Sequence, residues 1–155
     1  MGGFERQAFT RLRAADVEEL TSFLSTADLT LSGLDDPAVR LWLLRDEGGA
    51  LIGSTGYERS ANGDDVIIRS VAVGVDSRGA GLGSRLAGHA IDEARAEGAS
   101  RAWLFSRRSG PFWQKLGFEP ADRDELAAAL STTRQVRLFA ESGQLQREVA
   151  WSREL

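Results

Sequence analysis

Cysteine is absent from the chain, and histidine occurs only once, as His89. Without cysteine there is no disulfide, no thiol nucleophile and no thiolate ligand for a metal ion. A single histidine cannot form a histidine cluster, so we expect no metal site. Tyrosine and lysine are as scarce, with Tyr57 and Lys115 the sole examples of each.

A basic excess and long apolar runs are also missing. The 19 basic residues are outnumbered by 23 acidic ones, for a net charge of -4, which argues against nucleic acid as a partner. No stretch approaches the length of a membrane span and the N-terminus has no apolar signal region, so we expect a cytoplasmic protein without a membrane partner. The 155 residues, 42% of them apolar and 27% charged, predict one globular domain over 1–155.

Strand and helix patterns alternate along the chain. β-Branched and apolar runs bounded by turn residues predict strands at Gln7–Arg13, Val39–Arg45, Ala50–Arg59, Asp65–Val75, Arg101–Ser106 and Leu145–Trp151. Apolar residues at helical spacing predict a helix that begins after Asp16, a short turn at Leu29–Leu34, and helices at Ser84–Glu97, Gly110–Leu116 and Asp124–Leu130. Asp16 and Glu19 have the spacing of a capping box. The order predicts a mixed α/β sheet.

A glycine-rich loop, Arg78-Gly79-Ala80-Gly81-Leu82-Gly83-Ser84, connects the Asp65–Val75 strand to the next helix. The first amides of a helix have no intrahelical partner, and the helix dipole places partial positive charge there. Glycines let the backbone approach an anion closely, while Arg78 and Ser84 add a guanidinium and a hydroxyl. The loop is therefore a candidate cradle for a pyrophosphate group.

Three other interpretations of this loop have to be weighed. A dinucleotide-binding fingerprint needs Gly-x-Gly-x-x-Gly at the start of a βαβ unit, and the spacing here is Arg-x-x-Gly-x-Gly. A P-loop needs a Gly-Lys-Ser/Thr sequence, and the loop contains no lysine. Ordinary turn glycines stay open as an explanation for the loop considered alone.

Two flanking motifs accompany the loop, Ile68-Arg69-Ser70-Val71-Ala72-Val73 before it and Phe112-Trp113-Gln114-Lys115-Leu116-Gly117-Phe118-Glu119-Pro120 after it. In this order and at these separations, the three segments resemble the GNAT N-acetyltransferase superfamily. The match extends from about Ala50 to Pro120. Within the superfamily the chain looks most like the small arsenic-resistance-type N-acetyltransferases. The features that carry this likeness are the Ile68–Val73 strand, the short Ser106–Gly110 link and the short helix Asp124–Leu130 before the last strand.

The resemblance implies the GNAT acyl-CoA N-acyltransferase fold, with splayed central strands flanked by helices and acetyl-CoA bound as co-substrate in the gap. By carry-over, backbone groups of Val71 and Val73 would pair with the pantetheine, and the backbone amide of Val71 or Ala72 would be the oxyanion donor. Amides of Gly79, Ala80, Gly81, Leu82, Gly83 and Ser84, together with Arg78, would hold the pyrophosphate. The segment with Phe112, Trp113 and Lys115 would flank the pantetheine on its other side.

The catalytic groups are less clearly indicated. Many superfamily members have a tyrosine where this chain has Trp113, and an indole N–H does not release a proton near neutral pH. Either water protonates the thiolate, or Ser106 or Ser109 assists through a hydrogen bond. Glu58, on the strand before Ile68–Val73, is the candidate general base, with a solvated strand-edge charge as the alternative.

Arg69 is a charge within an apolar strand, where it is costly unless paired. It either pairs with an acid such as Glu58 or binds an oxyanion of an amino-acid-like acceptor. Tyr57, on the preceding strand, is assigned with Arg69 to the acceptor side.

The function implied is direct transfer of an acetyl group to a primary amine of a small molecule, in a ternary complex. The alternatives are a protein or peptide N-acetyltransferase and a cofactor-binding sensor module that has lost its chemistry. Dimers are common in the superfamily, so a homodimer is one expected assembly.

Overall fold

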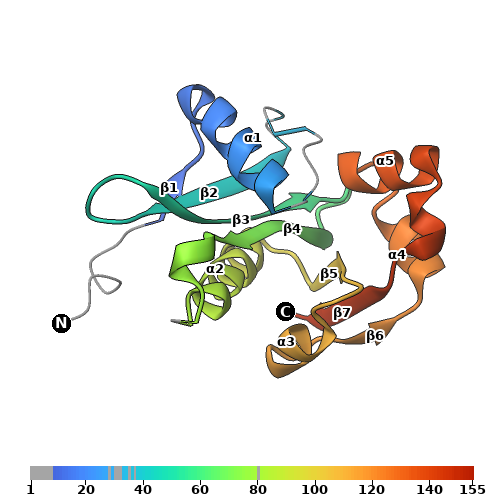
Figure 1. The fold of residues 1–155 in the computed structure, drawn as a ribbon. Helices are drawn as coiled ribbons and strands as arrows, with labels where there is room; N and C mark the ends of the chain where they lie inside the picture. Colours follow the sequence, from blue (N-terminus) through green and yellow to red (C-terminus); the bar gives the residue numbers. More distant parts are fainter. Residues whose placement is uncertain (1–8, 28, 30–32, 35, 37, 80) are drawn as a thin grey trace.

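The computed structural model describes residues 9–27, 29, 33–34, 36, 38–79 and 81–155 (Figure 1). These residues form a seven-stranded sheet in the order β1-β2-β3-β4-β5-β7-β6, in which only β4 and β5 pair in parallel. The strands are β1 (Thr10–Arg11), β2 (Val39–Arg45), β3 (Leu51–Arg59), β4 (Asp65–Val73), β5 (Arg101–Phe105), β6 (Glu119–Ala121) and β7 (Ala150–Glu154). The predicted mixed α/β sheet is confirmed.

Helices cover both faces of the sheet. They are α1 (Val17–Thr26), α2 (Leu82–Ala96), α3 (Gly110–Lys115), α4 (Arg123–Ala129) and α5 (Arg134–Ser142). The helices α1, α4 and α5 pack on one face, and α2 and α3 pack on the other (Figure 1). Among the residues described, no helix has both the length and the apolar character needed to cross a bilayer.

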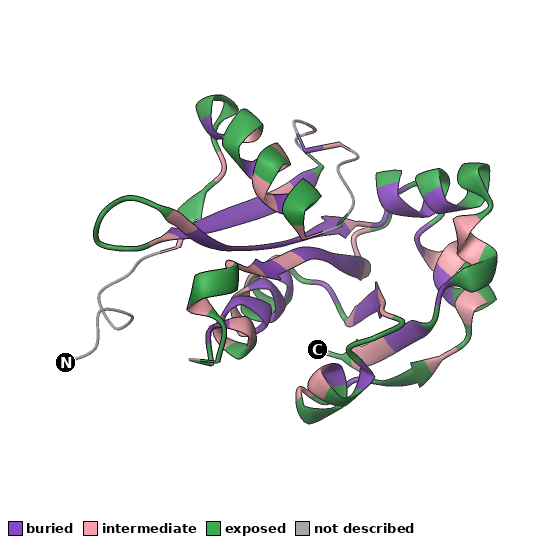
Figure 2. Ribbon diagram, viewed as in Figure 1, coloured by how far each residue is buried: buried purple, intermediate pink, exposed green. Residues whose placement is uncertain are grey.

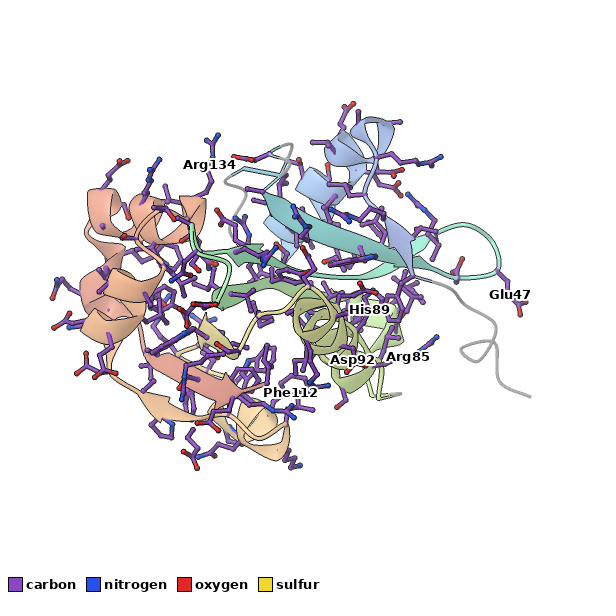
Figure 3. The ribbon with its side chains drawn as sticks, turned by 180° about the vertical axis from the view of Figure 1, so that it is seen from behind. Glu47, Arg85, His89, Asp92, Phe112 and Arg134 are labelled. Carbon is purple, nitrogen blue, oxygen red and sulfur yellow. The ribbon has the colours of Figure 1, made fainter. Side chains whose placement is uncertain are left out.

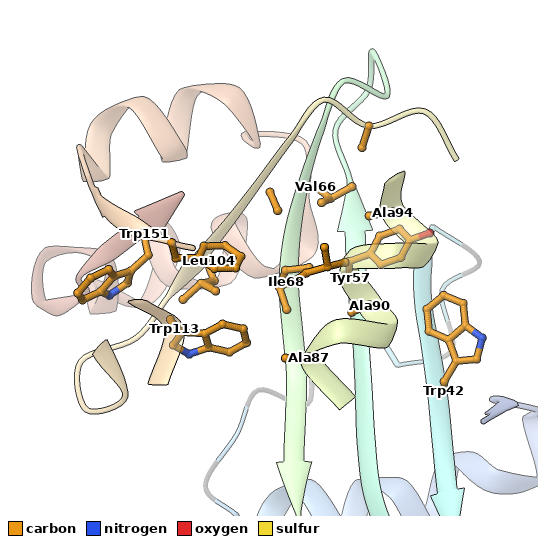
Figure 4. Close-up of a cluster of buried hydrophobic side chains, with 14 residues drawn as sticks. Trp42, Tyr57, Val66, Ile68, Ala87, Ala90, Ala94, Leu104, Trp113 and Trp151 are labelled. Carbon is orange, nitrogen blue, oxygen red and sulfur yellow. The ribbon is translucent and has the colours of Figure 1, made fainter. Parts of the chain in front are cut away.

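The core beneath α2 is built from small helix residues. Ala87, Ala90 and Ala94 are fully buried against Val66 and Ile68 of β4. Alanine side chains let the helix lie close to the strands, so the central strands are buried on both faces (Figures 2 and 4). This close packing fixes the start of α2 beside the end of β4.

Most predicted boundaries lie within two residues of the observed ones. The largest error is at the C-terminus, where the predicted strand Leu145–Trp151 is wrong. Residues Gln144–Arg147 form a 3₁₀ turn, and the strand is Ala150–Glu154. The strand predicted to Val75 ends at Val73, because a 3₁₀ turn follows Gly74. Most of the turn expected at Leu29–Leu34 lies outside the described residues.

The predicted capping box at Asp16 is wrong. Asp16 is the N-cap of α1, but its side chain makes no cap hydrogen bond. It accepts hydrogen bonds from Arg13 and Arg45 instead, and Glu19 also binds Arg45. Two arginines thus outcompete the local helix amides for these carboxylates.

Candidate active site

The strands β4 and β5 pair only at their amino-terminal ends. They pair only through Asp65–Ile67 and Arg101–Trp103. Beyond Ile67, β4 continues to Val73 against β3 alone, while β5 pairs with β7 (Figure 1). A gap therefore opens between the carboxyl ends of two parallel strands, which confirms the splayed arrangement expected of the fold.

A cleft of 490 Å³ lies along this gap. Seven of the residues predicted to bind the cofactor line it: Val71, Ala72, Val73, Arg78, Gly83, Phe112 and Trp113. A smaller space of 140 Å³ shares Leu29, Val71, Ser109 and Trp113 with this cleft, and Arg69 and Ser106 also line it. We call the larger space the outer cleft and the smaller one the inner cleft.

A bulge in β4 lies at the junction of the two spaces. Ser54 faces Ala72 and Gly56 faces Arg69, so three steps on β4 match two on β3. Ser70 takes up the extra residue with a φ of 62°, the only positive φ of a non-glycine among the residues described. Its carbonyl accepts a 2.6 Å hydrogen bond from Ser54 Oγ, which holds the bulge in place.

The bulge reverses the alternation of side chains along β4. Before it, Ile68 packs toward α2 and Ile67 toward α4. After it, Val71 and Val73 pack toward α2 and Ala72 toward α1. A backbone in the left-handed region at a functional cleft is a common sign of local strain retained for function. The sequence pattern contained no signal for this bulge.

The glycine-rich loop has the geometry of an anion cradle. Gly79 and Gly81 have φ values of 89° and 75°, and nothing lies within 4 Å of a Cβ built on either. Glycine is therefore needed for backbone conformation and not for lack of space. Because α2 begins at Leu82, the amides of Leu82, Gly83 and Ser84 lack intrahelical partners.

The other loop residues differ in their surroundings. Arg78 lines the outer cleft, and Ser84 is exposed on the first turn of α2. The Leu82 side chain is buried in the core, so only its backbone can face a ligand. Ala80 lies outside the described residues. Lys115 is exposed at the end of α3 and is absent from the cleft lining, so its cofactor role stays a prediction.

Two aromatic residues of α3 form the opposite wall of the outer cleft. Phe112 and Trp113 contact each other edge to face with centroids 5.0 Å apart. Trp113 continues into the core against Phe118 at 5.3 Å. Phe112 faces α2, where a Cβ on Gly83 would lie 3.4 Å from its ring (Figure 3). The α3 wall of the outer cleft is thus apolar, and Arg78 adds a positive charge where the cleft reaches the glycine-rich loop.

Arg69 and Glu58 form a buried ion pair beside the inner cleft. Arg69 donates from Nη1 to Glu58 Oε1 at 3.2 Å, and their side chains are only 1% and 3% exposed. Glu58 also accepts backbone N–H bonds from Arg134 at 2.5 Å and Gln135 at 3.3 Å. Burial lowers the pKa of Arg69, while Glu58 opposes that shift. The pair ties β3 and β4 to the start of α5.

The sequence of residues 6–118 matches the acetyltransferase (GNAT) family. This chain belongs to the GNAT acetyltransferase family. The splayed strands, the loop at the start of α2 and the outer cleft are the parts of the GNAT fold expected for CoA binding, and the enzyme class is that of an acyltransferase.

Several known proteins are similar to this GNAT chain. An amino-acid acetyltransferase of Neisseria meningitidis is 35% identical over 81 residues, which are 52% of this chain and 19% of that protein. N-acetylglutamate synthase of Neisseria gonorrhoeae, complexed with coenzyme A and N-acetyl-glutamate, has a TM-score of 0.76 at 22% identity. That likeness covers 96% of this chain and 35% of the synthase.

A GNAT-family acetyltransferase of Staphylococcus aureus has a TM-score of 0.74 at 14% identity, over 96% of this chain and 99% of its own. The chain spans about a fifth of the curated relatives that it matches. The structural likenesses show the fold, and the match to the family shows the class of enzyme.

The remaining predicted site residues lie in different places. Ser106 lines the inner cleft, where its Oγ accepts a 3.0 Å hydrogen bond from the Ser109 amide. Tyr57 lies away from the cleft, fully buried beneath α2, and its hydroxyl donates to Glu97 (Figure 4). Burial also raises the pKa of Tyr57. The structure therefore does not bring Tyr57 to the acceptor side of this GNAT site.

Glu58, the candidate general base, also lies outside both clefts. Its carboxylate is held by Arg69 and by two backbone amides, and it does not line the inner or the outer cleft. A role as general base stays a prediction. Among the residues described, no three His, Asp or Glu side chains are gathered as a metal site.

Proposed function

We propose that this GNAT chain transfers the acetyl group of acetyl-CoA to a primary amine of a small, amino-acid-like molecule, directly and in a ternary complex. The observation that carries the proposal is the buried Arg69 in the wall of the inner cleft. A guanidinium there can bind a carboxylate or another oxyanion of the acceptor. A space of 140 Å³ suits an amino acid better than a folded protein surface.

The chain's own residues have distinct parts in this transfer. The loop amides and Arg78 would hold the pyrophosphate, and Val71–Val73 would pair with the pantetheine along the edge of β4. Acetyl-CoA, when bound, supplies the acetyl group as an activated thioester. A backbone amide of Val71 or Ala72, next to the bulge, would donate to the carbonyl oxygen as negative charge develops on it.

Proton movement completes the proposed reaction. The amine nitrogen forms a bond to the carbonyl carbon as the carbon–sulfur bond breaks, so one proton leaves the nitrogen and one reaches the sulfur. Trp113 stands where an acid would be expected, and its indole N–H can only donate a hydrogen bond. We assign Ser106 to a hydrogen bond with the leaving sulfur, with water as the proton source. Holding both reactants in place then supplies much of the rate enhancement.

Release of free thiol from acetyl-CoA tests this function. The panel should include glutamate and other amino acids, simple alkylamines, peptides, and arsenical and phosphinic amino acids. Faster turnover of amino acids than of alkylamines or peptides is the expected result. Preference for the arsenical would support the arsenic-resistance-type resemblance.

Two outcomes would contradict the proposal. Preference for peptides would favour a protein or peptide N-acetyltransferase. A thermal shift with acetyl-CoA, but no turnover with any amine, would favour the sensor module. Gel filtration of the same preparation would test the expected homodimer.

A further inference from the structure

Two buried oxygen atoms of the inner cleft have no hydrogen-bond partner among the residues described. They are Ser70 Oγ, on the bulge of β4, and Gln135 Oε1, on the first turn of α5, and both atoms belong to residues that line the cleft. Both residues are 7% exposed, and both line the inner cleft with Arg69. Buried polar atoms are nearly always paired, because an unpaired one loses its hydrogen bonds to water without replacement. Two in one small cleft point to a ligand that supplies the missing donors.

The backbone holds each of these side chains firmly. Ser70 takes its direction from the left-handed conformation of the bulge, whose carbonyl is tied to Ser54. Gln135 is fixed through its backbone amide, which donates a hydrogen bond to Glu58 Oε1. The same carboxylate oxygen accepts the hydrogen bond from Arg69. One carboxylate therefore sets the positions of a donor, Arg69, and an acceptor, Gln135, in the same cleft.

The chemistry of the unpaired groups indicates what they bind. Ser70 Oγ and Gln135 Oε1 can each accept a hydrogen bond. The neighbouring backbone amide of Val71 or Ala72 is the proposed donor to the thioester carbonyl oxygen. A neutral primary amine carries two N–H bonds and one lone pair. If both N–H bonds are accepted by protein oxygens, the lone pair is left facing the outer cleft, where attack on the thioester takes place.

We propose that Ser70 Oγ and Gln135 Oε1 accept the two N–H bonds of the acceptor amine and thereby restrict the enzyme to primary amines. This inference rests on the proposed acetyl transfer. Arg69 would bind an anionic group of the same acceptor molecule, so the inner cleft would recognise the amine and the anionic group together. Ser70 and Gln135 are specificity-determining residues in this scheme.

N-Methylation removes one of the two N–H bonds and gives a direct test. Thiol release would be measured with glutamate, glutamine and glycine, each beside its N-methyl derivative. The wild-type protein should prefer the primary amine by about tenfold or more in kcat/KM, because one buried acceptor is left unpaired by the methylated compound. Gln135→Met should narrow that preference by about tenfold, and Gln135→Glu, which keeps an acceptor oxygen, should retain it.

Further variants separate hydrogen bonding from folding. Ser70→Ala and Ser70→Gly both remove the hydroxyl, while glycine also relieves the left-handed backbone. Both should raise the KM of the primary amines alike. Gln146→Met, an exposed glutamine bonded to Arg123, is the matched control and should change neither KM nor the preference.

The outcomes distinguish this inference from the function on which it rests. Suppose that the wild-type protein turns over amines, but that Gln135→Met keeps the preference for primary over N-methylated amines and both Ser70 variants keep the wild-type KM. That result would overturn the inference and leave the proposed function standing. No amine-dependent thiol release by the wild-type protein, despite binding of acetyl-CoA, would overturn the proposed function and the inference together. Equal loss of preference in Gln135→Met and Gln135→Glu would point to packing and also refute it.

Discussion

The guanidinium of Arg69 and the carboxylate of Glu58 meet 3.2 Å apart between β3, β4 and α5, with both side chains almost completely shielded from water. This ion pair explains how the charge of Arg69 is accommodated inside an otherwise apolar strand. It does not exclude contact with an acceptor, since Arg69 also lines the inner cleft. A buried pair of this kind combines a structural role with a position at the site.

We expect removal of one partner of this pair to destabilise the protein strongly. Glu58→Leu removes the carboxylate that pairs with the buried Arg69, and it also removes the acceptor for two backbone amides of α5, at a cost of about 3–5 kcal/mol in the free energy of unfolding. Adding Arg69→Met should recover a large part of that loss. Urea denaturation of the two single variants and the double variant measures the coupling. Additive losses in the double variant would show that the pair is not coupled.

Arg69 should also set the choice of acceptor. Arg69→Met removes the proposed oxyanion partner and should raise the KM of glutamate by about 10–100-fold relative to that of a plain alkylamine. The ratio of the two KM values is the quantity to compare, because a smaller folded fraction lowers the apparent kcat of both reactions equally and leaves this ratio unchanged. If both KM values rise by the same factor, Arg69 has no part in acceptor recognition.

Gly83 should be necessary for the width of the outer cleft. A Cβ at Gly83 would lie 3.4 Å from Phe112 and 3.8 Å from Val73, which both line the cleft. Gly83→Leu should therefore weaken acetyl-CoA binding by about tenfold or more, or about 1.4 kcal/mol, in a calorimetric titration. Gly88→Leu on the same helix is the control, because nothing lies within 4 Å of its Cβ. Equal affinities in the two variants would contradict the proposed position of the cofactor.

His89 predicts a dependence of stability on pH. Its ring stacks on Phe9 with centroids 4.0 Å apart, and burial lowers its pKa from 6.5. Glu93 and Asp92 oppose that shift, and Arg85 reinforces it. Figure 3 labels Arg85, His89 and Asp92. A depressed pKa means that the unfolded chain binds the proton more readily. The contribution of His89 to stability is thus present above about pH 6.5 and decreases as the pH falls below it.

The measurement is the urea midpoint between about pH 5 and pH 8, for the wild-type protein and for His89→Phe. The phenyl ring preserves the stacking on Phe9 but cannot take up a proton. Subtracting the urea midpoint of His89→Phe from that of the wild-type protein at each pH removes the pH dependence that the carboxylates cause in both proteins. A difference that stays constant over this range would show that His89 titrates normally.

Some features were predictable because they depend on local sequence. The strand Val39–Arg45 was predicted with its observed bounds, since an apolar run between turn residues has few alternatives. The anion cradle was recognised from Gly79, Gly81 and the start of α2 for a similar reason. Backbone conformation there is determined by residue type.

Other elements were missed because their local signal is weak. In α5, Val136 and Phe139 are the only apolar side chains buried, so the apolar face is narrow. Thr133, which caps α5 through a hydrogen bond to the Val136 amide, was the signal that could have revealed this helix. The short β6 strand contains Pro120, a residue that lowers expectation of a strand.

By itself, the sequence determined most of the strands and helices up to α4, the position of the glycine loop and the family to which the chain is similar, because these follow from residue types at short range. The partner of Arg69, the burial of Tyr57 and the bulge at Ser70 depend on which strands lie side by side, so only the tertiary structure decided them. Gln135 shows the same point most clearly. The helix that carries Gln135 gives a weak local signal. Gln135 reaches the inner cleft because its backbone amide binds Glu58, 77 residues earlier in the chain.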